Sequence, residues 1–244
     1  MILTNLILKK LFILSFLLSL VLLSCDKEPE PESEPIWAYC NFFHYVPELE
    51  SVIWEVDEVE VPDAKDYAEL FPGSIILDAA VENISFTVKQ SGNKEVLATE
   101  IFQLEHEKFY NITLCGTTGD PFIFIQEIET SRPGEGMVKF QVFHSAPGQS
   151  SIDLYMGGTT ADKRVVSDLD VFNFSEPFEA QGFDARATIT VSAHSQEYIQ
   201  DSVLLHSIFN EEISSGASYL GVLAPSTFDP ESELTLWIYD LPHE

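Results

Sequence analysis

One short stretch occurs twice in this chain and constrains the fold more than any other feature. Residues 37–47 read WAYCNFFHYVP and residues 137–147 read MVKFQVFHSAP, so a Phe-His pair and a closing proline recur at an offset of 100 positions. Each copy alternates apolar and polar side chains before its proline. The pattern predicts a β-strand with one buried face, which ends where proline cannot donate a hydrogen bond to a neighbouring strand.

Similar short runs rich in β-branched and aromatic residues continue through both halves, separated by turn-forming Pro, Gly, Asn and Asp. Regular short strands of this kind are typical of a β-sandwich or barrel. The repeat persists at the far end, where a Tyr-and-Asp-Pro pattern beginning at Tyr110 recurs from Tyr219 at an offset of 109. We therefore predict an all-β chain with two tandem immunoglobulin-like β-sandwich domains, residues 36–131 and 137–244.

The N-terminus predicts an export signal and a lipid anchor. Two lysines precede the apolar run 11–23, which has the length of a secretory signal and is too short for a stable membrane span. The run leads into the tetrapeptide LLSC, which resembles the lipobox of bacterial lipoproteins, whose cysteine becomes the lipidated N-terminus. We predict a signal peptide over residues 1–24 and lipidation of Cys25, with acyl chains as the membrane anchor.

A disordered acidic tether is expected over residues 25–35. After the cysteine it reads DKEPEPESEP, which cannot bury enough apolar surface to offset the entropy of ordering. The segment resembles the acidic export signal of Bacteroidota surface lipoproteins, and this resemblance implies an outer-membrane protein on the cell surface. Asp26 beside the cysteine also resembles an inner-membrane retention signal of enterobacteria, so the periplasmic face stays as the alternative.

The strongly negative net charge of the chain restricts the kinds of partner that it can bind. The whole chain has a formal net charge of −28, and removal of residues 1–24, with two lysines and no acid, leaves 10 basic and 40 acidic residues, a net of −30. A polyanion of this size repels nucleic acid, which we exclude as a partner. The sequence carries no nucleophile-elbow, phosphate-loop, zinc or calcium motif. We therefore expect no catalytic residue, no cofactor and no metal.

Cys40 and Cys115 are the cysteines that remain once Cys25 is lipidated. Cys40 is in phase with the inward side chains of the second copy, which predicts that it is buried. Two cysteines make no zinc site, and neither has a neighbouring base or cation that would activate a thiolate. Two interpretations stay open: a pair of buried free thiols, or a disulfide between the first and last strands of the first domain.

Histidines and aromatic residues are the remaining candidates for a site. His44 and His144 end the two repeated strands, and we interpret them as fold elements bonded to the backbone of the following turn, with a ligand-facing role as the alternative. Trp54, Tyr155 and Trp237 are candidate ligand-binding aromatics, because flat rings stack on sugars. Packing in the core is the alternative for all three.

The second copy carries a family resemblance. Residues 138–147 read VKFQVFHSAP and residues 151–155 read SIDLY, followed by Gly157 and Gly158. These motifs resemble the opening of the domain-of-unknown-function 4397 (DUF4397) family, whose members typically begin V-R-F-V-H-A-S-P and continue V-D-V-Y-V-D-G. The resemblance covers residues 137–240 well and residues 37–130 weakly. It implies secreted or surface β-sandwich modules, often in tandem, with no established activity and no catalytic residues to carry over.

These observations predict a non-catalytic lipoprotein of the cell envelope that binds or presents a glycan or another envelope protein. Its lipid anchor, its acidic tether and its two sandwich modules suit binding above a membrane. A purely structural envelope component is the alternative. A hydrolase with an unrecognised carboxylate or histidine site is the enzymatic rival.

Overall fold

The computed structural model describes residues 36–63, 65–69, 75–158, 160–181, 187–193, 204–211, 215–230 and 233–241. These residues form seventeen β-strands and one short 3-10 helix, η1 (Ala161–Lys163). The prediction of an all-β fold is confirmed. Within this part of the chain, no helix is long and apolar enough to cross a membrane.

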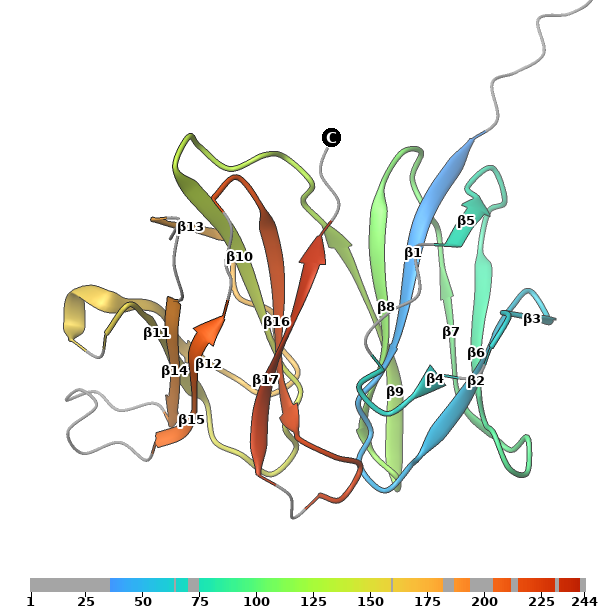
Figure 1. Ribbon diagram of the computed structural model, residues 1–244. Coiled ribbons are helices and arrows are strands. Elements are labelled where there is room, and N and C mark those ends of the chain that lie inside the picture. Colours follow the sequence, from blue (N-terminus) through green and yellow to red (C-terminus); the bar gives the residue numbers. More distant parts are fainter. Residues whose placement is uncertain are drawn as a thin grey trace, which may run out of the picture. The chain divides into compact units, whose positions relative to one another are not determined.

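The strands pair into four sheets, which we number I to IV (Figure 1). Sheet I has the order β3 (Val59–Glu60), β2 (Ser51–Val56), β6 (Ile84–Gln90), β7 (Val96–Phe102), with β4 (Lys65–Asp66) also paired to β2. Sheet II has the order β5 (Ile75–Asp78), β1 (Trp37–His44), β8 (Phe109–Thr117), β9 (Asp120–Ile128). Sheet III has the order β13 (Phe178–Gln181), β10 (Met137–His144), β16 (Ser218–Pro225), β17 (Leu234–Leu241). Sheet IV has the order β12 (Arg164–Leu169), β11 (Ile152–Met156), β14 (Ala187–Ala193), β15 (Leu204–Glu211).

The sequence repeat is matched by the strand pairing. β1 runs parallel to β8 with His44 opposite Leu114, and β10 runs parallel to β16 with His144 opposite Leu223. The two histidines are 100 positions apart and the two leucines are 109 positions apart, the same offsets that relate the two halves of the sequence. The other described strand pairs are antiparallel. The repeated strands therefore occupy equivalent places in sheets II and III.

Two apolar clusters each lie between a pair of sheets. Trp54 of β2 and Phe86 of β6 meet the inward residues of sheet II, and Phe140 of β10 meets Leu154 of β11 between sheets III and IV. Alternate side chains of a strand point to opposite faces, so one face of each strand supplies these clusters. Each half of the chain therefore encloses a core of its own.

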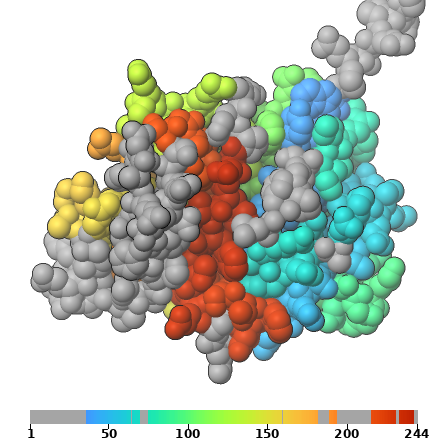
Figure 2. Space-filling view, viewed as in Figure 1, coloured from blue at the N-terminus to red at the C-terminus, as the bar shows by residue number. Residues whose placement is uncertain are grey.

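A third cluster joins sheets II and III through their other faces. The ring centroids of Phe43 and Tyr239 lie 5.1 Å apart, and Phe143 stacks on Phe174 at 4.4 Å. Figure 2 shows the red surface of the last strands directly adjoining the blue and teal surface of the first half. Residues Ile36–Glu244 form one compact unit, so the two halves pack against each other and sheets II and III share a seam.

Candidate functional site

The anchor predictions concern residues that precede the described part of the chain. Cys25, the signal peptide over residues 1–24 and the tether over residues 25–35 all lie outside it. Lipidation of Cys25 therefore stays a prediction.

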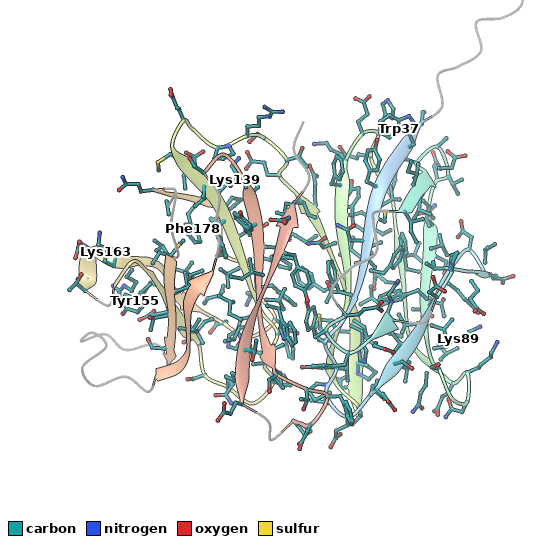
Figure 3. The ribbon with its side chains drawn as sticks, viewed as in Figure 1. Trp37, Lys89, Lys139, Tyr155, Lys163 and Phe178 are labelled. Carbon is teal, nitrogen blue, oxygen red and sulfur yellow. The ribbon has the colours of Figure 1, made fainter. Side chains whose placement is uncertain are left out.

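The structure corrects the prediction that Trp54 and Tyr155 present their rings to a ligand. Trp54 has no exposed surface and Tyr155 is 1% exposed. Trp54 shares its inward face with Val52, and it packs on Phe42 at a centroid distance of 5.1 Å. Tyr155 lies in β11 of sheet IV, where all five side chains are buried, on the opposite side of Figure 3 from Trp37. A ring without solvent access cannot stack on an incoming sugar.

Trp237 has a different environment from the other two predicted aromatics. It is half-buried on β17 and packs against the cluster between sheets II and III. Its indole Nε1 is buried and has no hydrogen-bond partner. Trp54, Tyr155 and Trp237 lie in sheets I, IV and III, so the structure does not bring the three together into one site.

The two repeated histidines brace the turns that follow their strands. His44 Nδ1 accepts the Val46 amide at 3.3 Å, while its Nε2 bonds the Leu49 carbonyl at 2.8 Å. His144 repeats the arrangement, with Nδ1 accepting from Ala146 at 3.4 Å and Nε2 bonding the Ser150 carbonyl at 3.1 Å. An amide can only donate, so Nδ1 carries no proton and each ring is neutral. The interpretation of these histidines as fold elements is confirmed.

Both described cysteines are buried free thiols, which agrees with the first of the two interpretations and contradicts the possible disulfide between Cys40 and Cys115. The β1–β8 register places Cys40 opposite Tyr110, five positions before Cys115. At about 3.3 Å per residue, the two Cα atoms are on the order of 16 Å apart, beyond the 7 Å limit for a disulfide. An odd spacing also puts the two thiols on opposite faces of sheet II: Cys40 faces sheet I, and Cys115 faces sheet III.

An aromatic group at one end of sheet II forms the strongest candidate site. Trp37 and Tyr39 of β1 contact edge to face at a centroid distance of 5.0 Å. Tyr39 stacks on Phe109 of β8 at 4.3 Å, and His106 meets Trp37 at 5.3 Å. We call these four residues the Trp37 cluster. Its three carbon-rich rings are half-buried and its histidine is exposed, so the cluster is open to solvent at one side.

Backbone hydrogen bonds fasten the loop before β8 to the start of β1. The Trp37 amide donates to His106 Nδ1 at 3.3 Å, and the Glu107 amide donates to the Trp37 carbonyl at 2.7 Å. The Tyr39 amide donates to the Lys108 carbonyl at 2.8 Å. The loop and the strand thus hold the Trp37 cluster in a preformed arrangement.

A hollow of about 330 Å³ opens beside this cluster. It is lined by residues 106–109 on one side and by residues 127–131 on the other. Phe109 and His106 contribute rings, while Thr130 and Ser131 contribute hydroxyls. We call it the first hollow. Its lining combines flat rings with polar groups that hydrogen-bond, which is the usual composition of a small-molecule site.

Ion pairs order the acidic side of the first hollow. Lys108 Nζ lies 2.7 Å from Glu127 Oε1, a contact that raises the pKa of Lys108. Lys139 Nζ lies 2.9 Å from Glu129 Oε1 and 2.5 Å from Ser131 Oγ. The Ser131 hydroxyl donates to Glu129, and together with Lys139 it lowers the pKa of that carboxyl. Lys139 therefore holds the Glu129 carboxylate and the Ser131 hydroxyl together beside the first hollow.

A second hollow of about 360 Å³ lies across the seam between the two halves. The first half contributes Gln126, Glu127 and Glu129, and the second half contributes Gln141 and residues 174–177. Gln141 is 7% exposed, and its Nε2 donates to the Ser175 carbonyl at 3.1 Å. Glu127 and Glu129 line both hollows. The two hollows are therefore neighbours that share a carboxylate rim.

No family model matches the chain, and no curated protein matches it.

The candidates chosen from the sequence include no residue that lines the first hollow, although part of the signal for the neighbouring Trp37 cluster was present. Trp37 and Tyr39 lie on β1 out of phase with the inward Cys40, so alternation alone places them on the outer face. Trp54 lies in phase with Val52, and this parity places it inside. His106 and the hydroxyl of Ser131 lie in connections between strands, where no periodicity indicates what a side chain will meet.

Proposed function

We propose that this protein is a non-catalytic lipoprotein of the cell envelope that binds carbohydrate. In this proposal acyl chains on Cys25 anchor it to the outer membrane, and the tether over residues 25–35 holds residues 36–244 above the cell surface. Support for the anchor comes from the lipobox-like LLSC motif after an apolar run. Membrane contact is through the lipid, and nucleic acid is not a partner.

We further propose that the two halves are tandem immunoglobulin-like modules related to the domain-of-unknown-function 4397 family. The equal register of the two parallel strand pairs supports this proposal. The matching hydrogen bonds of His44 and His144 support it as well, because the same side chain braces the same turn in each half.

The first hollow carries the proposal of carbohydrate binding. Phe109 offers a flat apolar ring at the wall of a hollow that also holds hydroxyl and carboxylate groups. Such a ring can pack on the C–H face of a sugar while carboxylates accept hydrogen bonds from its hydroxyls. Ion pairs fix Glu127 and Glu129 before any ligand arrives, which reduces the entropy lost on binding.

A binding assay with matched variants tests the site. The full-length protein, extracted in detergent, is applied to a glycan array together with Phe109→Leu and Phe228→Leu. Phe228 is 47% exposed and does not line either hollow, so it controls for loss of an exposed ring. We expect Phe109→Leu to weaken binding roughly fivefold, as loss of one aromatic contact would, and Phe228→Leu to bind as the parent does.

Two other results would favour the alternative functions, a structural component or a hydrolase. Capture of envelope proteins by crosslinking on cells, with no glycan bound on the array, would favour a purely structural or protein-binding component. Turnover of a polysaccharide by the purified protein would show that it is a hydrolase.

The lipid anchor and the cellular location are tested separately on cells. Labelling with a palmitate analogue should mark the parent protein and leave Cys25→Ala unlabelled. Protease added to whole cells should remove the parent protein if it lies on the outer face, and should leave it intact if it lies on the periplasmic face.

A further inference from the structure

We propose that the carbohydrate is a linear chain of at least two sugar units, free of acidic groups, that lies across the seam and occupies both hollows at once. This inference rests on the proposed function. It adds the length of the ligand, its charge and the use of both halves of the protein in one site.

The shared rim is the first support for a ligand that spans both hollows. Each hollow has a volume near the lower end of small-molecule pockets, which run from about 300 to 1,000 Å³. Glu127 and Glu129 belong to both linings, so the two hollows adjoin each other along these two residues. A unit bound in one hollow and linked to a unit in the other would gain affinity from the high effective concentration of the second.

The seam is fixed, so the second hollow is preformed. Phe174, which lines it, stacks on Phe143 at 4.4 Å and lies 5.4 Å from Phe124 of the first half. The linker between the halves, residues 129–136 between β9 and β10, is fastened as well, because Lys139 Nζ bonds both Glu129 and Ser131. Figure 3 shows Lys139 on β10 toward the same end of the strands as Trp37 on β1. The halves need not move to bring the two hollows into line.

Charge restricts the chemistry of the chain. The second hollow is lined by three carboxylates, those of Glu127, Glu129 and Glu176, and its described lining includes no lysine or arginine. The first hollow adds Glu107 and Lys108. Lys108 is paired with Glu127, and Lys139, which lines neither hollow, is paired with Glu129, so four described carboxylates face two lysines around the two hollows. Acidic sugars would meet repulsion here, whereas neutral or amino sugars would not. An exposed carboxylate such as Glu176 adds only weak, salt-dependent attraction for an amine.

Calorimetry with three oligosaccharide series tests the inference. The probes are glucosamine oligomers of one to six units, their N-acetylated counterparts and galacturonic acid oligomers, each titrated into the full-length protein in detergent. We expect affinity to rise about tenfold or more from one unit to three. Glucosamine oligomers should bind a few-fold more tightly than N-acetylated ones, and galacturonic acid oligomers should not bind.

Two variants separate the hollows. Phe109→Leu should weaken every length, because the first hollow contacts even a single unit. Glu176→Gln changes an exposed side chain of the second hollow, and it should weaken only the longer glucosamine oligomers while single units bind as before. Phe228→Leu serves as the control and should change nothing.

The outcomes distinguish the inference from the function on which it rests. Binding that does not depend on length, or an equal effect of Glu176→Gln on one unit and on six, would overturn the two-hollow site and leave carbohydrate binding intact. Tighter binding of the galacturonic acid series would overturn the charge argument. Absence of binding in all three series, together with a glycan array that shows no ligand, would overturn the proposed function itself.

Discussion

The phenol oxygens of Tyr45 and Tyr239 form a hydrogen bond with each other across the seam, although 194 positions separate the two residues in the chain. Tyr45 is 1% exposed and Tyr239 is 5% exposed. Burial raises the pKa of both phenols, so both are neutral and one donates to the other. Nearby, the Tyr67 hydroxyl donates to the Pro225 carbonyl at 3.0 Å. The seam thus contains a specific polar contact inside an apolar cluster.

We expect Tyr239→Phe to lower the free energy of unfolding by about 1–3 kcal/mol, because it leaves the Tyr45 hydroxyl buried without its partner. The double variant Tyr45→Phe with Tyr239→Phe should recover part of that loss, since it removes both polar groups. Urea unfolding of the parent, both single variants and the double variant gives the coupling. Strictly additive losses would show that the two hydroxyls do not interact.

The free energy of unfolding should decrease as the pH is lowered, because of the two histidines that brace turns. Desolvation lowers the pKa of His44 from 6.5 to about 4, and burial also lowers the pKa of His144. Below pH 6.5 His44 becomes protonated in the unfolded chain, whereas in the folded protein it stays neutral down to about pH 4. The stability contributed by neutral His44 is therefore present above pH 6.5 and is lost between pH 6.5 and pH 4, by about 2 kcal/mol at pH 5.

Urea unfolding at pH 7.5 and pH 5 of the parent and of His44→Asn measures this loss. Asparagine offers an oxygen in place of Nδ1 but does not titrate, so the variant should be less stable at pH 7.5 and show a flatter dependence on pH. Carboxylates titrate in both proteins and cancel in the comparison. The same slope in both would mean that His44 contributes nothing to the pH dependence.

The two described cysteines should react only after unfolding. Burial raises the pKa of the Cys40 thiol to about 12 and raises that of Cys115 further, so neither forms the reactive thiolate at neutral pH. In the mature, lipidated protein, whose Cys25 sulfur carries the lipid, we expect two reactive thiols per chain after denaturation without reduction, and almost no reaction with a thiol reagent before denaturation. Fewer than two thiols after denaturation would indicate a disulfide that the structure does not contain.

A side chain at position 221 should destabilise the protein, because the space around Gly221 is filled. A Cβ added there would lie 2.8 Å from Phe140 Cε1 and 3.2 Å from Leu236 Cδ1, both buried residues of the core between sheets III and IV. We expect Gly221→Ala to lower the free energy of unfolding by about 1–3 kcal/mol. Gly92→Ala is the matched control, because nothing lies within 4 Å of its added Cβ, and thermal unfolding should place it close to the parent.

The sequence alone determined the strand plan. The period-two pattern of residues 37–47 and 137–147 predicts strands with one inward face, and their common offset predicts equivalent places, which β1 and β10 take in sheets II and III. Alternation also placed Cys40 correctly in the core. The recurrence of His44 and His144 at the same point of the repeat indicated a turn-bracing role, because local hydrogen bonds depend on local sequence.

Only the tertiary structure decided which outer face is covered and which stays open. Alternation divides Trp37, Phe43 and Tyr45 from the inward residues of β1, but it cannot show that sheet III covers Phe43 and Tyr45 and stops short of Trp37. Strand register likewise separated Cys40 from Cys115. Both outcomes depend on contacts between residues distant in the chain, and local patterns carry no information about the partner of a face or the register of a pair.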